Sequence, residues 1–173
     1  CAIVPETHSF VLEGNILTGN CWFTTITEYE DFCFIFENLM LGGGVGFSIR
    51  REDIHELPKV KENIKVTHKP TKDADFIVPD SREGWVYLLR QVLKTYFRSG
   101  KSFSYSTLLI RGYGEKINGL GGTASGPKIL VDGIENICKI LETRAGKKLR
   151  SLEVLKRMSL LMADFREKYI LIL

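Results

Sequence analysis

The sequence has few of the residues that build metal sites. Its four cysteines stand at positions 1, 21, 33 and 138, no two of them form a Cys-x-x-Cys pair, and only three histidines could join them. Structural zinc sites need closely spaced Cys and His ligands, so no zinc site is expected. Long apolar runs are missing too. The longest is the terminal Ile170–Leu173, and a membrane-spanning helix needs roughly 20 apolar residues. We expect no membrane partner.

A large excess of one charge is also absent. The 24 Lys and Arg nearly balance the 21 Asp and Glu, which leaves a net charge of +3. A nucleic-acid-binding domain usually carries a strongly basic face, so nucleic acid is not an expected partner. The N-terminus lacks the basic and apolar regions of a secretory signal, which favours a cytoplasmic location. The 44% hydrophobic and 26% charged residues are typical of a globular protein with one core.

Several helices are predicted from apolar spacing and from the residues that start and stop helices. A buried helix over 29–41 ends at three glycines, and a second follows the capping-box spacing of Asp80–Glu83 and continues to Phe97. Pro127 suits the first turn of a third helix, which runs to Arg144. Ser151 is expected to cap a last helix.

Strands are predicted between these helices. A β-hairpin is expected over residues 10–17, a short strand over 45–49, two more over 63–67 and 75–78, and another over 103–110. The order of strand, loop and helix indicates an α/β fold. The polar stretch between Arg50 and Asp80 indicates an inserted lobe.

A glycine-rich segment, Gly119–Gly126, leads directly into Pro127. Such loops bring backbone N–H groups close to an anion, and the following helix N-terminus adds partial positive charge, which favours a phosphate site. Tight-turn packing explains these glycines equally well. The basic residues 144–150 are interpreted as the usual complement of a helix C-terminus, and Cys33 and Cys138 as small buried hydrophobes.

The order of short motifs is more specific than any one of them. The motifs are Asn20–Phe23, Leu41–Ile49, Asp80–Val86, Phe103–Tyr105 with Ile110-Arg111, and Gly121–Pro127. In this order they resemble the monomeric adenosylcobalamin-dependent ribonucleoside-triphosphate reductases, from Cys21 to about Arg150. The resemblance implies that residues 21–173 are the N-terminal part of a ten-stranded α/β barrel. It also implies a regulatory lobe inserted at about residues 50–105.

The resemblance further implies site residues and partners. Cys21 matches a thiol that delivers electrons to the ribose and ends as a disulfide. The implied substrate contacts are Gly43, Gly44, Gly121, Gly122, Thr123, Ala124, Ser125 and Gly126. The implied partners are a ribonucleotide substrate, a deoxynucleotide effector and a thioredoxin-type reductant, with adenosylcobalamin as cofactor. The radical-forming cysteine and the partner thiol of Cys21 belong to later parts of the family's sequence, so this chain alone is expected to be inactive.

Residues 1–20 carry a second resemblance, to the C-terminal end of an intein. Residues 4–12 and 14–17 match its pattern. Asn20 directly precedes Cys21, and at the end of an intein an asparagine that cyclises precedes the cysteine that accepts the transferred chain. The resemblance implies splicing roles for His8, Asn20 and Cys21, with a complementary intein half as partner. Gly19 replaces the histidine that commonly assists the asparagine, and an ordinary N-terminal β-hairpin remains the alternative.

Three functions therefore stand as hypotheses. The first is a fragment of a ribonucleotide reductase, and the second is an intein C-terminal piece joined to its reductase extein. The third is a nucleotide-binding fragment without chemistry of its own.

Overall fold

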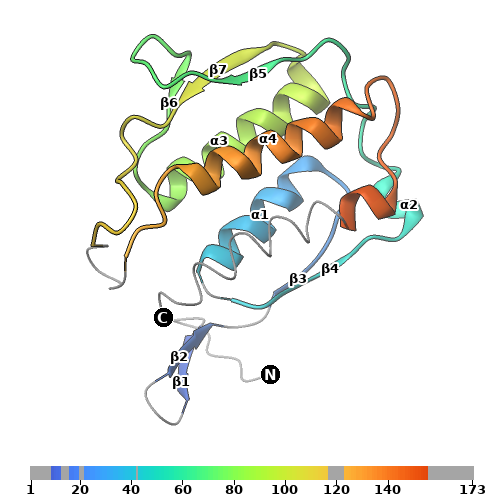
Figure 1. The fold of residues 1–173 in the computed structure, drawn as a ribbon. Helices are drawn as coiled ribbons and strands as arrows, with labels where there is room; N and C mark the ends of the chain where they lie inside the picture. The colour runs from blue at the N-terminus through green and yellow to red at the C-terminus, as the bar shows by residue number, and fades with distance from the viewer. Residues whose placement is uncertain (1–8, 13–15, 20–21, 42, 117–122, 156–173) are drawn as a thin grey trace.

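The computed structural model describes residues 9–12, 16–19, 22–41, 43–116 and 123–155. It has a mixed α/β fold (Figure 1). Strand β1 (Ser9–Leu12) pairs antiparallel with β2 (Ile16–Gly19). Residues 13–15 between them lie outside the described residues, so the hairpin and its assignment to an intein stay predictions.

The next unit is a parallel strand pair joined by a helix. Strand β3 (Trp22–Thr25) leads to α1 (Tyr29–Met40), and β4 (Val45–Ser48) then pairs parallel with β3. The carboxylate of Asp31 starts α1 by accepting hydrogen bonds at 2.9 Å from the N–H groups of Thr27 and Glu28. The buried face of α1 covers the two strands and also contacts α3.

A second, three-stranded sheet follows the short helix α2 (Arg51–Ile54). Its order is β5–β7–β6, and β5 (Val66–His68) and β6 (Phe76–Ile77) both run parallel to the central strand β7 (Phe103–Ser106). Helix α3 (Arg82–Lys94) connects β6 to β7, and its N-cap Ser81 accepts a hydrogen bond from the N–H of Gly84 at 3.0 Å. A π-helical segment, η1 (Thr95–Ser99), continues α3 and ends at Gly100 with φ 69°.

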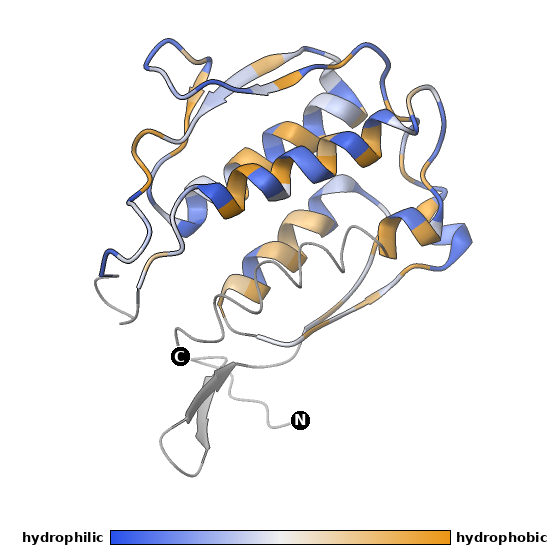
Figure 2. Ribbon diagram, in the orientation of Figure 1, coloured by the Kyte–Doolittle hydropathy of each residue, from blue (hydrophilic) through white to orange (hydrophobic). Residues whose placement is uncertain are grey.

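Helix α4 (Lys128–Glu142) lies beside α3, and both helices start at the same end of the molecule (Figure 1). The two helices separate the β5–β7–β6 sheet from α1, which in turn covers β3 and β4. Hydrophobic and hydrophilic residues alternate along these helices (Figure 2), and the buried residues of each helix are mostly apolar. Because α1, α3 and α4 contribute to one continuous core, the parallel β3–α1–β4 unit and the second sheet share their apolar interior. Among the described residues, no helix is long and apolar enough to cross a bilayer.

Several predicted boundaries differ from the structure. The strand expected over 103–110 ends at Ser106, and residues 108–110 turn instead. The strand expected to start at residue 63 starts at Val66, because Asn63 adopts φ 56°, which an extended strand does not allow. Ser151 is not a cap: it is already helical, and the N–H of the preceding residue, Arg150, donates to the Glu153 carboxylate at 3.0 Å.

Candidate nucleotide site

The first glycine turn, after α1, lies against Trp22. The N–H of Gly43 donates to the carbonyl of Asn38 at 3.1 Å, and the N–H of Trp22 donates to the carbonyl of Gly44 at 2.8 Å. A Cβ built on Gly43 would collide with the indole ring of Trp22. Glycine is therefore required here for packing, whatever Gly43 and Gly44 contribute to binding. The turn is therefore adjacent to Trp22, which begins β3 and directly follows Cys21 in the sequence. Cys21 itself lies outside the described residues.

The second glycine segment is reached through a short antiparallel ribbon, which we define as residues 114–116 and 123–124. Lys116 pairs with Thr123. The N–H of Gly114 donates to the carbonyl of Ala124 at 2.9 Å, and the N–H of Ala124 donates to the carbonyl of Glu115 at 2.7 Å. Gly121 and Gly122 lie outside the described residues. The ribbon therefore fixes the described half of the motif, from Thr123 onward.

Gly126 makes the bend from the ribbon into α4. Its φ of 74° lies in the left-handed region, and a Cβ there would come within 3.1 Å of the backbone nitrogen of Tyr113. Both constraints favour glycine. Ala124 and Gly126 are buried, Ser125 is half-buried, and Thr123 is exposed.

The N-terminus of α4 has the electrostatic character expected of an anion site. Its N-cap is Pro127, whose side chain makes no capping hydrogen bond, and the first turn contains no acidic residue. The unpaired N–H groups of a first turn carry partial positive charge, which favours an anion beside them. The hydroxyls of Thr123 and Ser125 precede this turn in the sequence. These features are compatible with the phosphate site that the sequence predicts, and the site stays a prediction.

The structure does not join the two glycine segments. The turn after α1 and the ribbon before α4 are separate loops (Figure 1), and no hydrogen bond between described residues connects them. His8, Asn20 and Cys21 lie outside the described residues, so their predicted splicing and redox roles stay predictions.

The two cysteines within the described part of the chain are both buried. Cys33 is 1% exposed and Cys138 is 6% exposed. Burial raises the pKa of the Cys33 thiol to about 12. A protonated and inaccessible thiol is a poor nucleophile, so the interpretation of both cysteines as small core residues is confirmed by their burial. Among the described residues, no group of three or more His, Cys, Asp or Glu could hold a metal ion.

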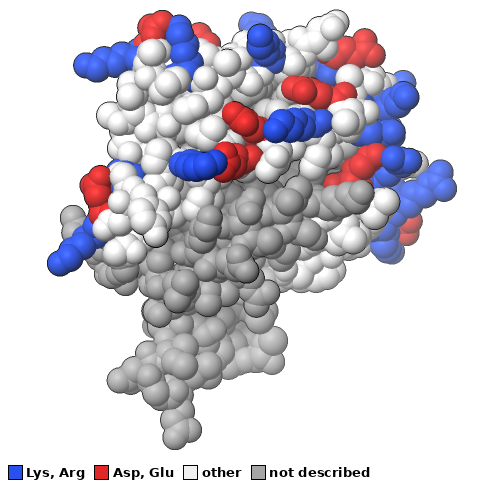
Figure 3. All heavy atoms as spheres, viewed as in Figure 1, with Lys and Arg blue, Asp and Glu red and all other residues white. Residues whose placement is uncertain are grey.

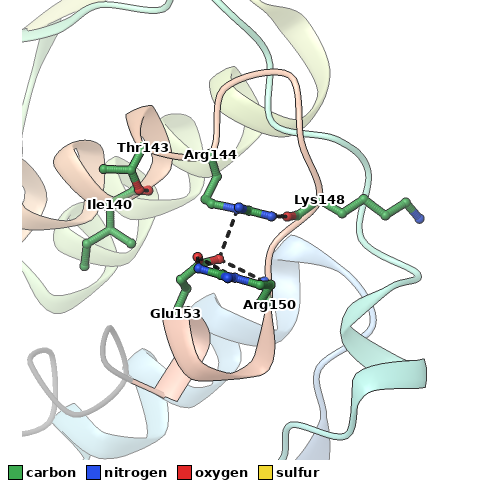
Figure 4. A network of polar contacts seen from close by, with 6 residues as sticks. All are labelled: Ile140, Thr143, Arg144, Lys148, Arg150 and Glu153. Atoms are coloured by element: carbon green, nitrogen blue, oxygen red, sulfur yellow. Dashed lines mark hydrogen bonds and ion pairs between the residues drawn. The ribbon is translucent and has the colours of Figure 1, made fainter.

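The basic residues after α4 form a structural link (Figure 4). The guanidinium of Arg144 donates to the carbonyl of Lys148 at 2.6 Å and lies 3.2 Å from the carboxylate of Glu153. Arg150 also donates to Glu153, at 2.7 Å. Although burial opposes it, the hydrogen bonds and charges of these arginines lower the pKa of Glu153. The cluster joins the end of α4 to the helical turn at 151–155. On the face of the molecule shown in Figure 3, Lys and Arg side chains are interspersed with Asp and Glu side chains.

The sequence did not reveal the ion pair that anchors the ribbon. Nε of Arg111 donates to Oδ2 of Asp80 at 2.6 Å, and Nη1 of Arg111 donates to the carbonyl of Lys116 at 3.3 Å. Both residues belong to motifs of the family resemblance, Asp80–Val86 and Ile110-Arg111. Nothing in the sequence indicates that the two residues form an ion pair across 31 positions.

The comparison with protein families matches more than half of the chain. Residues 53–141 match the family model described as the insertion domain of B12-dependent ribonucleotide reductase. The matched range contains α3, β7 and all of α4 but its last residue, and also the Arg111–Asp80 pair and the ribbon.

Individual proteins agree with this match. The chain is 31% identical to the adenosylcobalamin-dependent ribonucleoside-triphosphate reductase of Lactobacillus gasseri and 32% identical to that of Lactobacillus acidophilus, in each case over 78% of this chain. It spans about a quarter of the length of these relatives, 25% in both cases. A crystal structure of a B12-dependent class II ribonucleotide reductase superposes with a TM-score of 0.74 and 26% identity, covering 84% of this chain and 27% of that one. The chain therefore belongs to the B12-dependent ribonucleotide reductases and corresponds to part of such an enzyme, including its insertion domain.

Proposed function

We propose that this chain is part of an enzyme that reduces ribonucleoside triphosphates to deoxyribonucleotides, and that it contributes a nucleotide-binding segment. The observation that carries the proposal is the N-terminus of α4, which has Pro127 as its N-cap and no acidic residue in its first turn, preceded by Thr123–Gly126 within the region that matches the family. A triphosphate supplies the anionic groups that such a helix end and its neighbouring hydroxyls favour. The proposed substrate contacts are Gly43, Gly44, Gly121, Gly122, Thr123, Ala124, Ser125 and Gly126.

In this proposal Cys21 is one of two reducing thiols. Removal of the ribose 2′-hydroxyl as water needs two electrons and two protons. Two thiols supply them and become a disulfide, which a thioredoxin-type protein then reduces by thiol exchange. The partner of Cys21 would come from another part of the enzyme. Cys33 and Cys138 are unsuited to this role because both are buried in the core.

The relatives are adenosylcobalamin-dependent by name. The site of that cofactor is not evident among the described residues, and we assign them no step of its chemistry. We also propose that residues 21–173 are the N-terminal barrel part of a cytoplasmic enzyme. In the same proposal residues 50–105 form a lobe that responds to a deoxynucleotide effector.

Nucleotide binding by the chain tests this proposal. A ribonucleoside triphosphate at ten times its Kd should stabilise the folded chain by about 1.4 kcal/mol, visible as a higher melting temperature. Gly126→Ala should weaken binding because alanine strains the left-handed bend and approaches Tyr113. Gly100→Ala is the matched control. Gly100 also has a positive φ, at 69°, but it has open space around it and follows the C-terminal end of α3, whereas the ribbon is anchored at the N-terminal end of that helix.

Two results would count against the proposal: no shift in melting temperature at millimolar triphosphate, or equal binding by the Gly126→Ala and wild-type chains. The chain alone should form no deoxynucleotide when mixed with adenosylcobalamin, a dithiol and a ribonucleoside triphosphate. Turnover in that mixture would show that the proposed missing thiol is not required.

A second candidate function concerns residues 1–20. Strands β1 and β2 pair only with each other among the described strands, separate from the β3–β4 pair and from the three-stranded sheet, as a remnant of another protein would. We propose that these residues are an intein C-terminal remnant. Mixing the chain with a matching N-terminal intein half should give a ligated product, and Asn20→Ala should abolish cleavage. If no product forms with any matching half, residues 1–20 are an ordinary N-terminal segment.

A further inference from the structure

Two charged residues far apart in sequence meet at one edge of the second sheet. Strands β6 and β7 are parallel neighbours, so the segments that follow their carboxyl ends emerge side by side. Asp80 follows β6 and directly precedes Ser81, the N-cap of α3. Arg111 follows β7 after a turn closed by the N–H of Ile110, which donates to the carbonyl of Thr107 at 3.0 Å. The topology therefore brings Arg111 to the start of α3.

The Arg111 guanidinium makes two contacts in different directions. Nε binds Asp80 at 2.6 Å, and Nη1 donates to the carbonyl of Lys116, which is a ribbon residue. One planar group thus connects the N-terminal end of α3 to the ribbon that presents Thr123–Gly126. The neighbouring turn is braced as well, because the N–H of Gly112 donates to the Glu115 carboxylate at 2.6 Å.

From this geometry we infer that Arg111 and Asp80 are positioning residues: their ion pair fixes the ribbon, and through it the Thr123–Gly126 segment, relative to α3. The inference rests on the proposed function and deepens it, because it assigns the placement of the proposed nucleotide contacts to a pair that is not among those contacts. Arginine suits the task because its rigid fork can hold two acceptors at once, whereas a lysine ammonium on a flexible stem behaves as a point charge.

The pair contributes little to global stability, which separates positioning from folding. The two side chains are 29% and 30% exposed, and ion pairs near the surface have small net energies because water screens them. Another arginine–carboxylate pair, on α3, serves as a matched control. Arg90 of α3 donates to Glu30 of α1 at 2.7 Å, both side chains are 38% exposed, and no hydrogen bond between described residues joins either of them to the ribbon.

The first experiment measures amide hydrogen exchange in the 173-residue chain. In Arg111→Ala, exchange of the Gly114 and Ala124 amides should accelerate, while amides in the middle of α3 keep their wild-type rates. Arg90→Ala should leave both ribbon amides unchanged. Unchanged exchange at Gly114 and Ala124 in Arg111→Ala would overturn the inference, and this result does not depend on whether the chain binds nucleotide.

The second experiment measures the Kd of ATP and CTP by calorimetry. Residues without ligand contact alter coupling modestly, so Arg111→Ala should raise Kd roughly threefold to thirtyfold with little change in melting temperature. Arg111→Lys should recover part of the affinity, because it can restore the contact with Asp80 but not both acceptors together. An unchanged Kd in Arg111→Ala overturns the inference. Absence of binding by the wild-type chain counts against the proposed function instead, and the exchange rates then decide the positioning role.

Discussion

Gly43 is glycine because the indole of Trp22 occupies the space that any side chain would need. Gly43→Ala should therefore destabilise the chain by about 1–3 kcal/mol, the range for inserting a methyl group into a packed site. Gly46→Ala is the control, because its Cβ would come closest to the ring of Phe23, at 3.1 Å, and that side chain is 71% exposed and can move aside. Urea unfolding of both variants measures the difference. Equal midpoints would show that Trp22 relaxes without cost.

The buried thiols make a second prediction at this scale. Cys33 and Cys138 should resist a thiol reagent in the native chain and react only after unfolding, because their burial excludes the reagent and burial keeps the Cys33 thiol protonated. Mass spectrometry of peptides from native and denatured samples would locate each modified cysteine. Rapid native labelling of Cys33 would contradict its core position.

At the scale of elements, the link between α4 and the turn at 151–155 depends on one carboxylate. Glu153 accepts from Arg144 and Arg150, and its side chain is 13% exposed. Glu153→Gln should cost about 1–3 kcal/mol at pH 7, because two arginines lose their charged acceptor.

The same carboxylate predicts a pH dependence. The folded pKa of Glu153 is lowered, so its contribution is complete above its unfolded pKa of about 4.3 and is lost as the pH falls through the folded value. Stability measured from pH 7 to pH 3 should therefore fall less steeply in Glu153→Gln than in wild type. Parallel curves would mean that Glu153 has the same pKa folded and unfolded.

Helices were predicted more accurately than strands, and the reason is physical. The start of α1 at Tyr29 is encoded by residues within one turn of the helix end, and the N-cap of α3 lies at Ser81, one residue after the Asp80 that begins the predicted capping box. A strand ends where its partners end: β7 stops at Ser106 because β5 and β6 extend no farther, although Leu108 and Leu109 continue the apolar pattern. The π-helical segment was missed because Tyr96 and Phe97 continue the apolar face of α3.

The candidate site divides in the same way. Gly126 and Pro127 determine backbone shape locally, so their bend into a helix could be inferred from the sequence. The pairing of Arg111 with Asp80 could not, because it depends on β6 lying beside β7, a contact made only in the folded sheet.

At the scale of the whole molecule, one apolar core joins the β3–α1–β4 unit to the second sheet through α1 and α3. The chain should therefore unfold in one cooperative transition. Its two tryptophans report on the two parts, since Trp22 lies in β3 and Trp85 in α3. Trp22→Phe and Trp85→Phe each leave one fluorescent probe, and each probe should report the same midpoint as circular dichroism of that variant. A probe midpoint separated from the helical midpoint would show that the two parts unfold independently.

The order β5–β7–β6 also has a consequence for synthesis on the ribosome. Among the described strands, both outer ones pair only with the central one, which is the last of the three to be translated. Until residues 103–106 have left the exit tunnel, β5 and β6 have no sheet to join, and the apolar face of α3 has neither β7 nor α4 to cover it. The nascent chain therefore exposes the apolar residues of β5, β6 and α3 for longer than those of the β3–α1–β4 unit. Chaperones that bind exposed apolar segments are expected to bind mainly to this part of the chain.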